Sequence, residues 1–193
     1  GFFVSTNGHM VTNNHVIDSC DMVKAHYKGR ELDADVLFTD RMNDLAIIKA
    51  NLKPNKVFPV SAEDVSLLED IIVAGYPLGN MVSDTIKVTK GIVSATRGMD
   101  NNFSQFEIDA VIRKGNSGGP IYDSKGNIVG VVVERFNVNR SDNVNFAIKG
   151  STVKQFLSAH NVSTKWSNRQ DDMSTKDIYK IASKQTVMVV CHR

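Results

Sequence analysis

Short runs of β-forming residues, separated by turn residues, fill most of positions 1–150 of this sequence. An Asn7-Gly8 pair between two of the runs is a hairpin signal, because both residue types tolerate positive φ. No helical pattern of useful length occurs before Ser151. The sequence therefore predicts an all-β fold, either a barrel or a sandwich. The strongest runs are 22–27, 31–38, 45–50, 71–74, 85–95, 104–112, 127–134 and 144–148, with shorter candidates at 2–5 and 9–12.

The segment 51–68 is different in character, because it is polar and holds two of the four prolines. We interpret it as the linker between two β units of similar size. A helix is expected at 151–160, where Val153, Phe156 and Leu157 repeat at helical spacing. A second helix is expected at 174–184 with Ser174 as its cap, and a final β run follows at 186–191.

The composition limits the classes of protein to which the chain can belong. The chain has 193 residues, of which 41% are hydrophobic and 23% are charged, as in ordinary globular proteins. The net charge of +2 does not suggest a nucleic-acid partner. No run of 18 apolar residues is present, so we expect no membrane span. Cys20 and Cys191 permit at most one bridge, and we interpret them as two reduced thiols, with no spacing typical of a metal site.

The segment 115–120 (Gly-Asn-Ser-Gly-Gly-Pro) is the most informative hexapeptide. A serine flanked by glycines can sit on a tight turn with its hydroxyl exposed, and the glycines let backbone N–H groups converge on one point. An acyl-transfer site needs this combination of nucleophile and oxyanion hole. The alternative is a glycine-rich hairpin loop without a chemical role.

A serine hydroxyl needs a base, and a histidine base needs a carboxylate that orients it. Among five histidines, His15 lies where a β run gives way to one apparent helical turn, so its ring can be held rigidly. Asp44 opens an apolar strand and is placed to be buried and to point at a neighbour. Taken singly, His15 could be structural and Asp44 could be a turn residue.

Together these motifs resemble the HtrA/Deg family of trypsin-like serine proteases. The family motifs are matched at 12–16 (Thr-Asn-Asn-His-Val), 44–46 (Asp-Leu-Ala) and 115–120, in the order His, Asp, Ser. Further similarity occurs at 75–79, 91–95, 108–110 and 145–148. The resemblance covers about residues 1–158.

The resemblance implies a chymotrypsin-like fold of two packed six-stranded antiparallel β barrels, followed by a C-terminal helix and a further helix-strand tail. The expected protease domain is 1–158, with barrel one at 1–52, a linker at 53–68, barrel two at 69–150 and the helix at 151–160. The C-terminal extension is 161–193. Because only five strand candidates precede the linker, we predict that 186–191 completes barrel one, within the chain or in a neighbouring copy. The alternatives are a strand packed elsewhere or a disordered tail.

The resemblance also implies roles for individual residues. The catalytic set is His15, Asp44 and Ser117, and the oxyanion hole is formed by the N–H groups of Gly115 and Ser117. Asn116 has no charge, so we expect activation without a freed N-terminal amine and consider a flip of the Gly115 peptide instead. The absence of a buried acid favours small or medium aliphatic P1 residues. The implied substrate-binding residues are Val111, Ile112, Arg113, Lys114, Val133, Glu134, Arg135, Asn145, Phe146 and Ala147.

The sequence thus predicts a serine endopeptidase that acts on unfolded or misfolded proteins, with protein or peptide substrates as partners and no cofactor, metal or nucleic acid. A homo-oligomer and a periplasmic or secreted location are expected from the resemblance alone, and no PDZ domain is expected after the protease domain. The alternatives are a non-enzymatic binding module or chaperone, and an esterase. The order His, Asp, Ser disfavours the esterase, because α/β-hydrolases place the serine first.

Overall fold

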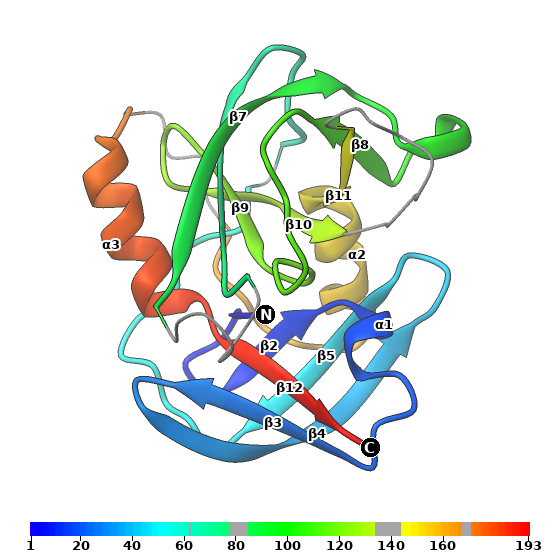
Figure 1. The fold of residues 1–193 in the computed structure, drawn as a ribbon, viewed down its shortest axis with the longest axis vertical. Coiled ribbons are helices and arrows are strands. Elements are labelled where there is room, and N and C mark those ends of the chain that lie inside the picture. Colours follow the sequence, from blue (N-terminus) through cyan, green and yellow to red (C-terminus); the bar gives the residue numbers. More distant parts are fainter. Residues whose placement is uncertain (62, 78–84, 134–143, 167–170) are drawn as a thin grey trace.

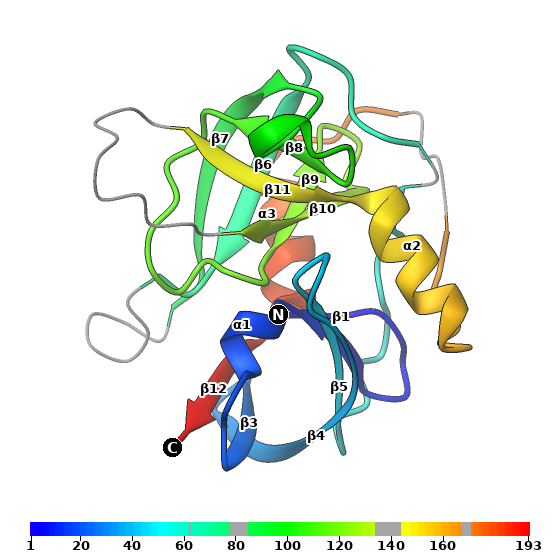
Figure 2. The same cartoon turned by 90° about the vertical axis from the view of Figure 1, so that its right-hand side faces the viewer.

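Two six-stranded antiparallel sheets, packed one above the other, make up the computed structural model (Figures 1 and 2). It describes residues 1–61, 63–77, 85–133, 144–166 and 171–193. The strands are β1 (Phe2–Phe3), β2 (His9–Thr12), β3 (Met22–Tyr27), β4 (Arg30–Asp40), β5 (Leu45–Ala50), β6 (Asp70–Gly75), β7 (Lys87–Ala95), β8 (Gln105–Ile108), β9 (Pro120–Asp123), β10 (Ile128–Val133), β11 (Asn145–Lys149) and β12 (Met188–His192). The helices are α1 (Asn14–Ile17), α2 (Gly150–Ala159) and α3 (Thr175–Gln185), and η2 (Met99–Asn101) is a short 3-10 turn.

The first sheet has the order β1-β2-β5-β4-β3-β12 and curves into a half-barrel. Its last strand comes from the C-terminal end of the chain. β12 pairs antiparallel with β3 from Met188↔His26 to His192↔Met22, and it is drawn in red beside the blue β3 in Figure 1. Just before β12, Val187 N donates to the carbonyl oxygen of Gly1 over 2.8 Å. The C-terminal run is therefore the sixth strand of this sheet, in the same chain.

The second sheet closes on itself as a barrel in the order β10-β11-β8-β7-β6-β9. Two of its strands differ from the expectation. β9 was not predicted, because it is a four-residue run that begins with Pro120 and is buried on both faces, so no alternation marks it. β8 ends at Ile108 and not at 112, because Asp109 Oδ1 accepts from Ile92 N over 2.7 Å and interrupts the regular ladder.

The two sheets share a core that the helices extend. One apolar cluster joins Leu45 of the first sheet to Tyr122 and Ile148 of the second, and α2 and α3 add side chains such as Leu157 and Ile178 to it. Burying such surface is the main source of stability of a fold of this kind. In the described ranges no helix is long and apolar enough to cross a membrane.

Gln185, the last residue of α3, is fully buried between the sheets. Its Nε2 donates to the carbonyl oxygens of Phe3 (2.8 Å) and Phe58 (3.1 Å), and its Oε1 accepts from Tyr122 Oη over 3.4 Å. Burial raises the pKa of the Tyr122 hydroxyl far above its usual range, so Tyr122 stays a donor. One side chain thus links the first sheet, the connecting segment and the second barrel.

Candidate active site

His15 lies on α1, the single helical turn that follows β2. Its Nδ1 is 2.7 Å from Asp44 Oδ2, and its backbone N donates to Asp44 Oδ1 over 2.9 Å. An ionised carboxylate only accepts, so Nδ1 carries the proton and Nε2 keeps a lone pair. One aspartate thus fixes both the position of the histidine backbone and the tautomer of its ring.

Asp44 itself is held in an unusual backbone conformation just before β5. Its φ is 55°, a left-handed value that aspartate and asparagine adopt more readily than most residues. Its carbonyl oxygen accepts from Asn13 Nδ2 over 2.9 Å and from Asn14 N over 3.2 Å. Asn13 is fully buried. Asn13 therefore positions Asp44 through its side chain and Asn14 through its backbone N–H, roles that the sequence analysis did not assign.

Ser117 lies on a turn of the second barrel that requires glycine at two points. Asn116 N donates to Arg113 O over 3.0 Å, and Gly115 within this turn has a φ of 99°, which side chains disfavour. Gly118 has a φ of 76°, and a Cβ there would collide with Thr12 Oγ1 of β2. The absence of that Cβ lets the serine turn pack directly against the residues that precede His15.

His15 and Ser117 line one cavity of about 520 Å³. Gly75, Tyr76 and residues 114–115 contribute the wall on the side of barrel two, and residues 186–191 contribute the opposite wall. No hydrogen bond joins Ser117 Oγ to His15, and within the described residues the N–H groups of Gly115 and Ser117 donate to no acceptor. Those two N–H groups are therefore available for an oxyanion next to the serine.

The ten residues predicted to bind substrate are not all in one place. Lys114 lines the cavity of Ser117, while Val111 and Arg113 line a second cavity of about 570 Å³ beside β7. Ile112 packs against the core of barrel two. Asn145 Nδ2 donates to Ala110 O over 2.9 Å. Val133, Phe146 and Ala147 are buried in β10 and β11.

Glu134 and Arg135, also predicted to bind substrate, lie outside the described residues. The assignment of these ten residues to substrate binding therefore stays a prediction. Residues 186–191 were not expected in the site, because their sequence shows only an apolar β run. Their position follows from the pairing of β12 with β3.

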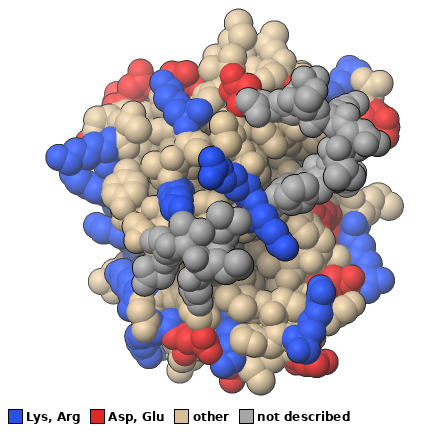
Figure 3. Space-filling model, in the orientation of Figure 1, with Lys and Arg blue, Asp and Glu red and all other residues tan. Residues whose placement is uncertain are grey.

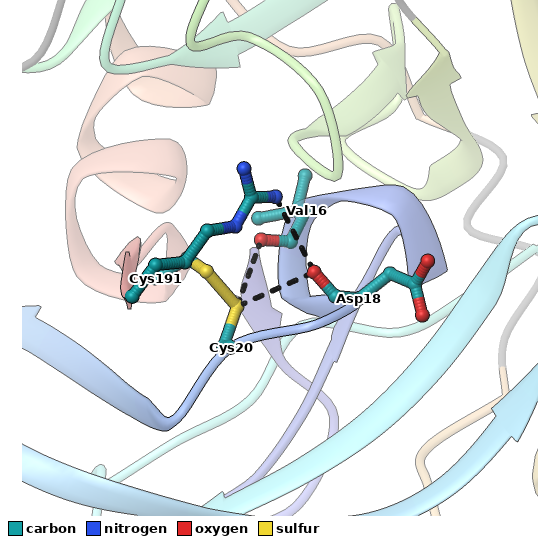
Figure 4. Close-up of a disulfide and its surroundings, with 5 residues drawn as sticks. Val16, Asp18, Cys20 and Cys191 are labelled. Carbon is teal, nitrogen blue, oxygen red and sulfur yellow. Dashed lines mark hydrogen bonds between the residues drawn. A yellow bond between two sulfur atoms is a disulfide. The ribbon is translucent and has the colours of Figure 1, made fainter.

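A disulfide joins Cys20 to Cys191 (Figure 4). The interpretation of these residues as two reduced thiols was wrong, because pairing of β12 with β3 brings positions 171 residues apart in sequence to a Cα–Cα distance of 5.3 Å. Cys20 Sγ lies 3.8 Å from the carbonyl oxygens of Val16 and Asp18, at the end of α1. The bridge therefore ties the helix that carries His15 to β12.

The site holds no evident metal-binding set. Among the residues that the structure describes, no group of three His, Cys, Asp or Glu side chains is placed to hold a metal ion. The cavity and its surroundings supply a hydroxyl, an imidazole paired with a carboxylate, and backbone N–H groups.

Two six-stranded β sheets with a serine, a histidine and an aspartate gathered between them define the chymotrypsin-like class of serine peptidases. A family model described as the trypsin-like peptidase domain matches residues 1–131. The chain belongs to this family.

Further similarities extend over most of the chain. An uncharacterized protein y4bJ of Sinorhizobium fredii is 32% identical over 99% of this chain and 32% of its own length. A probable periplasmic serine endoprotease, DegP-like, of Brucella suis is 36% identical over 92% of this chain and 36% of its own length. The crystal structure of the serine endoprotease from Yersinia pestis matches with a TM-score of 0.68 and 26% identity, over 83% of this chain and 56% of that one. The chain spans about a third of the length of these curated relatives.

Proposed function

We propose that the protein is a serine endopeptidase that cleaves peptide bonds through an acyl-enzyme on Ser117. The observation that carries this proposal is the pairing of His15 Nδ1 with Asp44 Oδ2 at 2.7 Å beside a serine in the same cavity. A base that a carboxylate already orients is what a serine nucleophile needs.

The mechanism follows from these atoms. Ser117 Oγ attacks the scissile carbonyl carbon while His15 Nε2 takes the hydroxyl proton, and the N–H groups of Gly115 and Ser117 hold the oxyanion. His15 then gives the proton to the leaving amine, and water hydrolyses the acyl-enzyme by the same steps reversed. Asp44 stabilises the imidazolium in each half. Because catalytic hydrogen bonds often tighten only when substrate binds, the missing Ser117–His15 bond is compatible with this path.

We further propose unfolded or misfolded proteins as substrates, and small or medium aliphatic P1 residues. The open cavity with apolar walls suits an extended chain better than a folded surface. A periplasmic location is supported by the DegP-like relatives, which are described as periplasmic, and disulfides persist in oxidising compartments. Homo-oligomer formation is proposed on the family resemblance alone.

A fluorophosphonate probe tests the proposed chemistry, because it labels only an activated serine. We expect labelling of Ser117 in the wild-type protein and loss of labelling in His15→Ala and Ser117→Ala. The matched control is His192→Ala, which changes an exposed histidine of β12. A wild-type protein that stays unlabelled while it binds unfolded protein would instead be a binding module.

Turnover measurements separate the peptidase from the esterase. We expect the wild-type protein to degrade unfolded casein, and Ser117→Ala to leave it intact. Hydrolysis of a simple ester without cleavage of casein would reject the endopeptidase.

A further inference from the structure

The cavity of Ser117 has one wall that the catalytic mechanism does not use. Every residue from Thr186 to Cys191 lines it. This wall is fixed at three places: by the ladder with β3, by the hydrogen bond of Val187 N to Gly1 O, and by the disulfide to Cys20. A wall held in this way can act as a rigid template for a ligand.

Side-chain alternation shows which residues of β12 face away from the interior of the first sheet. Val187 is buried there and Val189 packs against the same cluster. Met188 and Val190 therefore lie on the opposite face of the strand, where both are half-buried and both line the cavity. Met188 and Val190 are thus cavity-lining side chains of β12 that do not belong to the core cluster of the first sheet.

The chemistry of the wall is apolar. Val16 and Tyr76 line the cavity with the β12 side chains, and among the described lining residues only His15, Lys114 and the Tyr76 hydroxyl are titratable side chains, beside the α-amino group of Gly1. On the face drawn in Figure 3, positive and negative side chains are scattered and do not gather into a field of one sign. Contact with aliphatic or aromatic side chains is therefore favoured here over charge recognition.

The mechanism tells which part of a substrate passes this wall. The imidazole of His15 donates its proton to the leaving nitrogen, so the leaving segment begins beside His15. The end of α1 and β12 lie on that side, joined by the disulfide. Val133 and Asn145, which were predicted to bind substrate, lie on barrel two and do not line this cavity, whereas Lys114 of the same predicted set does.

We propose that β12 forms the subsites for the residues that follow the scissile bond, and that Met188 and Val190 make the enzyme prefer apolar residues at the first two of these positions, P1′ and P2′. This inference rests on the proposed peptidase function and adds to it the selection of the leaving segment.

Two substrates with the same acyl part test the inference. One is an internally quenched peptide that continues past the scissile bond, made with Leu, Asp or Lys at P1′ and P2′. The other is a peptide anilide, which has no residue beyond that bond. For Val190→Glu we expect kcat/KM to fall about 10-fold on the Leu peptide, to rise on the Lys peptide and to change much less on the anilide, whose aniline ring is the only group beyond the scissile bond. Met188→Ala should weaken the preference for Leu without introducing a charge.

The matched control is Val36→Glu, on β4 of the same sheet, where the side chain is 43% exposed and does not line the cavity. It should leave both substrates unaffected. Equal losses on peptide and anilide in both β12 variants, or an unchanged preference at P1′ and P2′ in both, would overturn the inference while leaving the peptidase function intact. A wild-type protein that cleaves neither substrate and takes no fluorophosphonate label would instead reject the peptidase function, and this inference with it.

Discussion

His15 and Asp44 are joined to each other and to the preceding backbone by a set of hydrogen bonds, whereas Ser117 Oγ and the N–H groups of Gly115 and Ser117 have no partner among the described residues. The base therefore comes from a half of the site that is already ordered, on the first sheet. The nucleophile comes from a glycine-rich turn of barrel two in which two backbone donors, those of Gly115 and Ser117, have no acceptor among the described residues. The difference indicates that the substrate completes the serine half, while the histidine half is ready beforehand.

The largest change in the histidine half should come from Asp44→Asn. Asparagine accepts the left-handed backbone at this position, so the substitution removes the charge while keeping the shape. We expect kcat to fall about 10⁴-fold, because the wrong tautomer of His15 is favoured and the imidazolium loses its partner. Steady-state kinetics on a peptide substrate measures this. The control is Asp35→Asn, which changes an exposed aspartate on β4 and should leave kcat unchanged.

In the serine half, Gly115→Ala should have the next largest effect. With φ at 99°, a Cβ strains the turn and displaces an oxyanion donor. We expect kcat to fall about 10²- to 10³-fold while KM changes little. Gly29→Ala is the matched control, because Gly29 has a φ of 72° but no atom near its absent Cβ. If both variants keep full activity, the donor role of Gly115 is wrong.

A smaller loss is expected from Asn13→Ala, which removes the amide that holds Asp44 O. We expect kcat to fall about 10- to 100-fold through misplacement of the His15–Asp44 pair, and the free energy of unfolding to fall by about 1–3 kcal/mol. Kinetics and urea denaturation measure the two effects. Asn7→Ala, in the exposed turn after β1, should change neither. Full activity in Asn13→Ala would mean that Asp44 is held adequately without the amide.

Gln185→Ala should weaken the packing that supports both halves of the site and should leave the catalytic step unchanged. It leaves the buried carbonyls of Phe3 and Phe58 without a donor, so the free energy of unfolding should fall by about 3 kcal/mol. The specific activity of the folded protein should not change. Gln155→Ala, exposed on α2, serves as control. A loss of activity without a loss of stability would contradict a purely structural role.

The sequence predicted the parts of the molecule that local patterns encode. Runs such as 45–50 alternate or are continuously apolar, which predicts strands. The three motifs around His15, Asp44 and Ser117 contain the side chains that acyl transfer needs. β9 was not predicted, because it is a short run that begins with Pro120 and is buried on both faces. The disulfide and the role of Asn13 were not predicted for another reason, because each depends on a partner that is distant in sequence. Cys20 meets Cys191 only once β12 has paired, and Asn13 meets Asp44 O only in the turn before β5.

The pairing of residues 186–192 with residues at the other end of the chain has a consequence for biosynthesis. Contacts between Phe2 and Thr186, and between Gly1 and Val187, are among the most distant in sequence that the fold contains. Such contacts form late, because the intervening chain must first be ordered. Barrel two can close while translation continues, but the sheet beneath His15 must wait for β12 to leave the ribosome. Until then the sheet lacks its sixth strand and the cavity lacks the wall that residues 186–191 form.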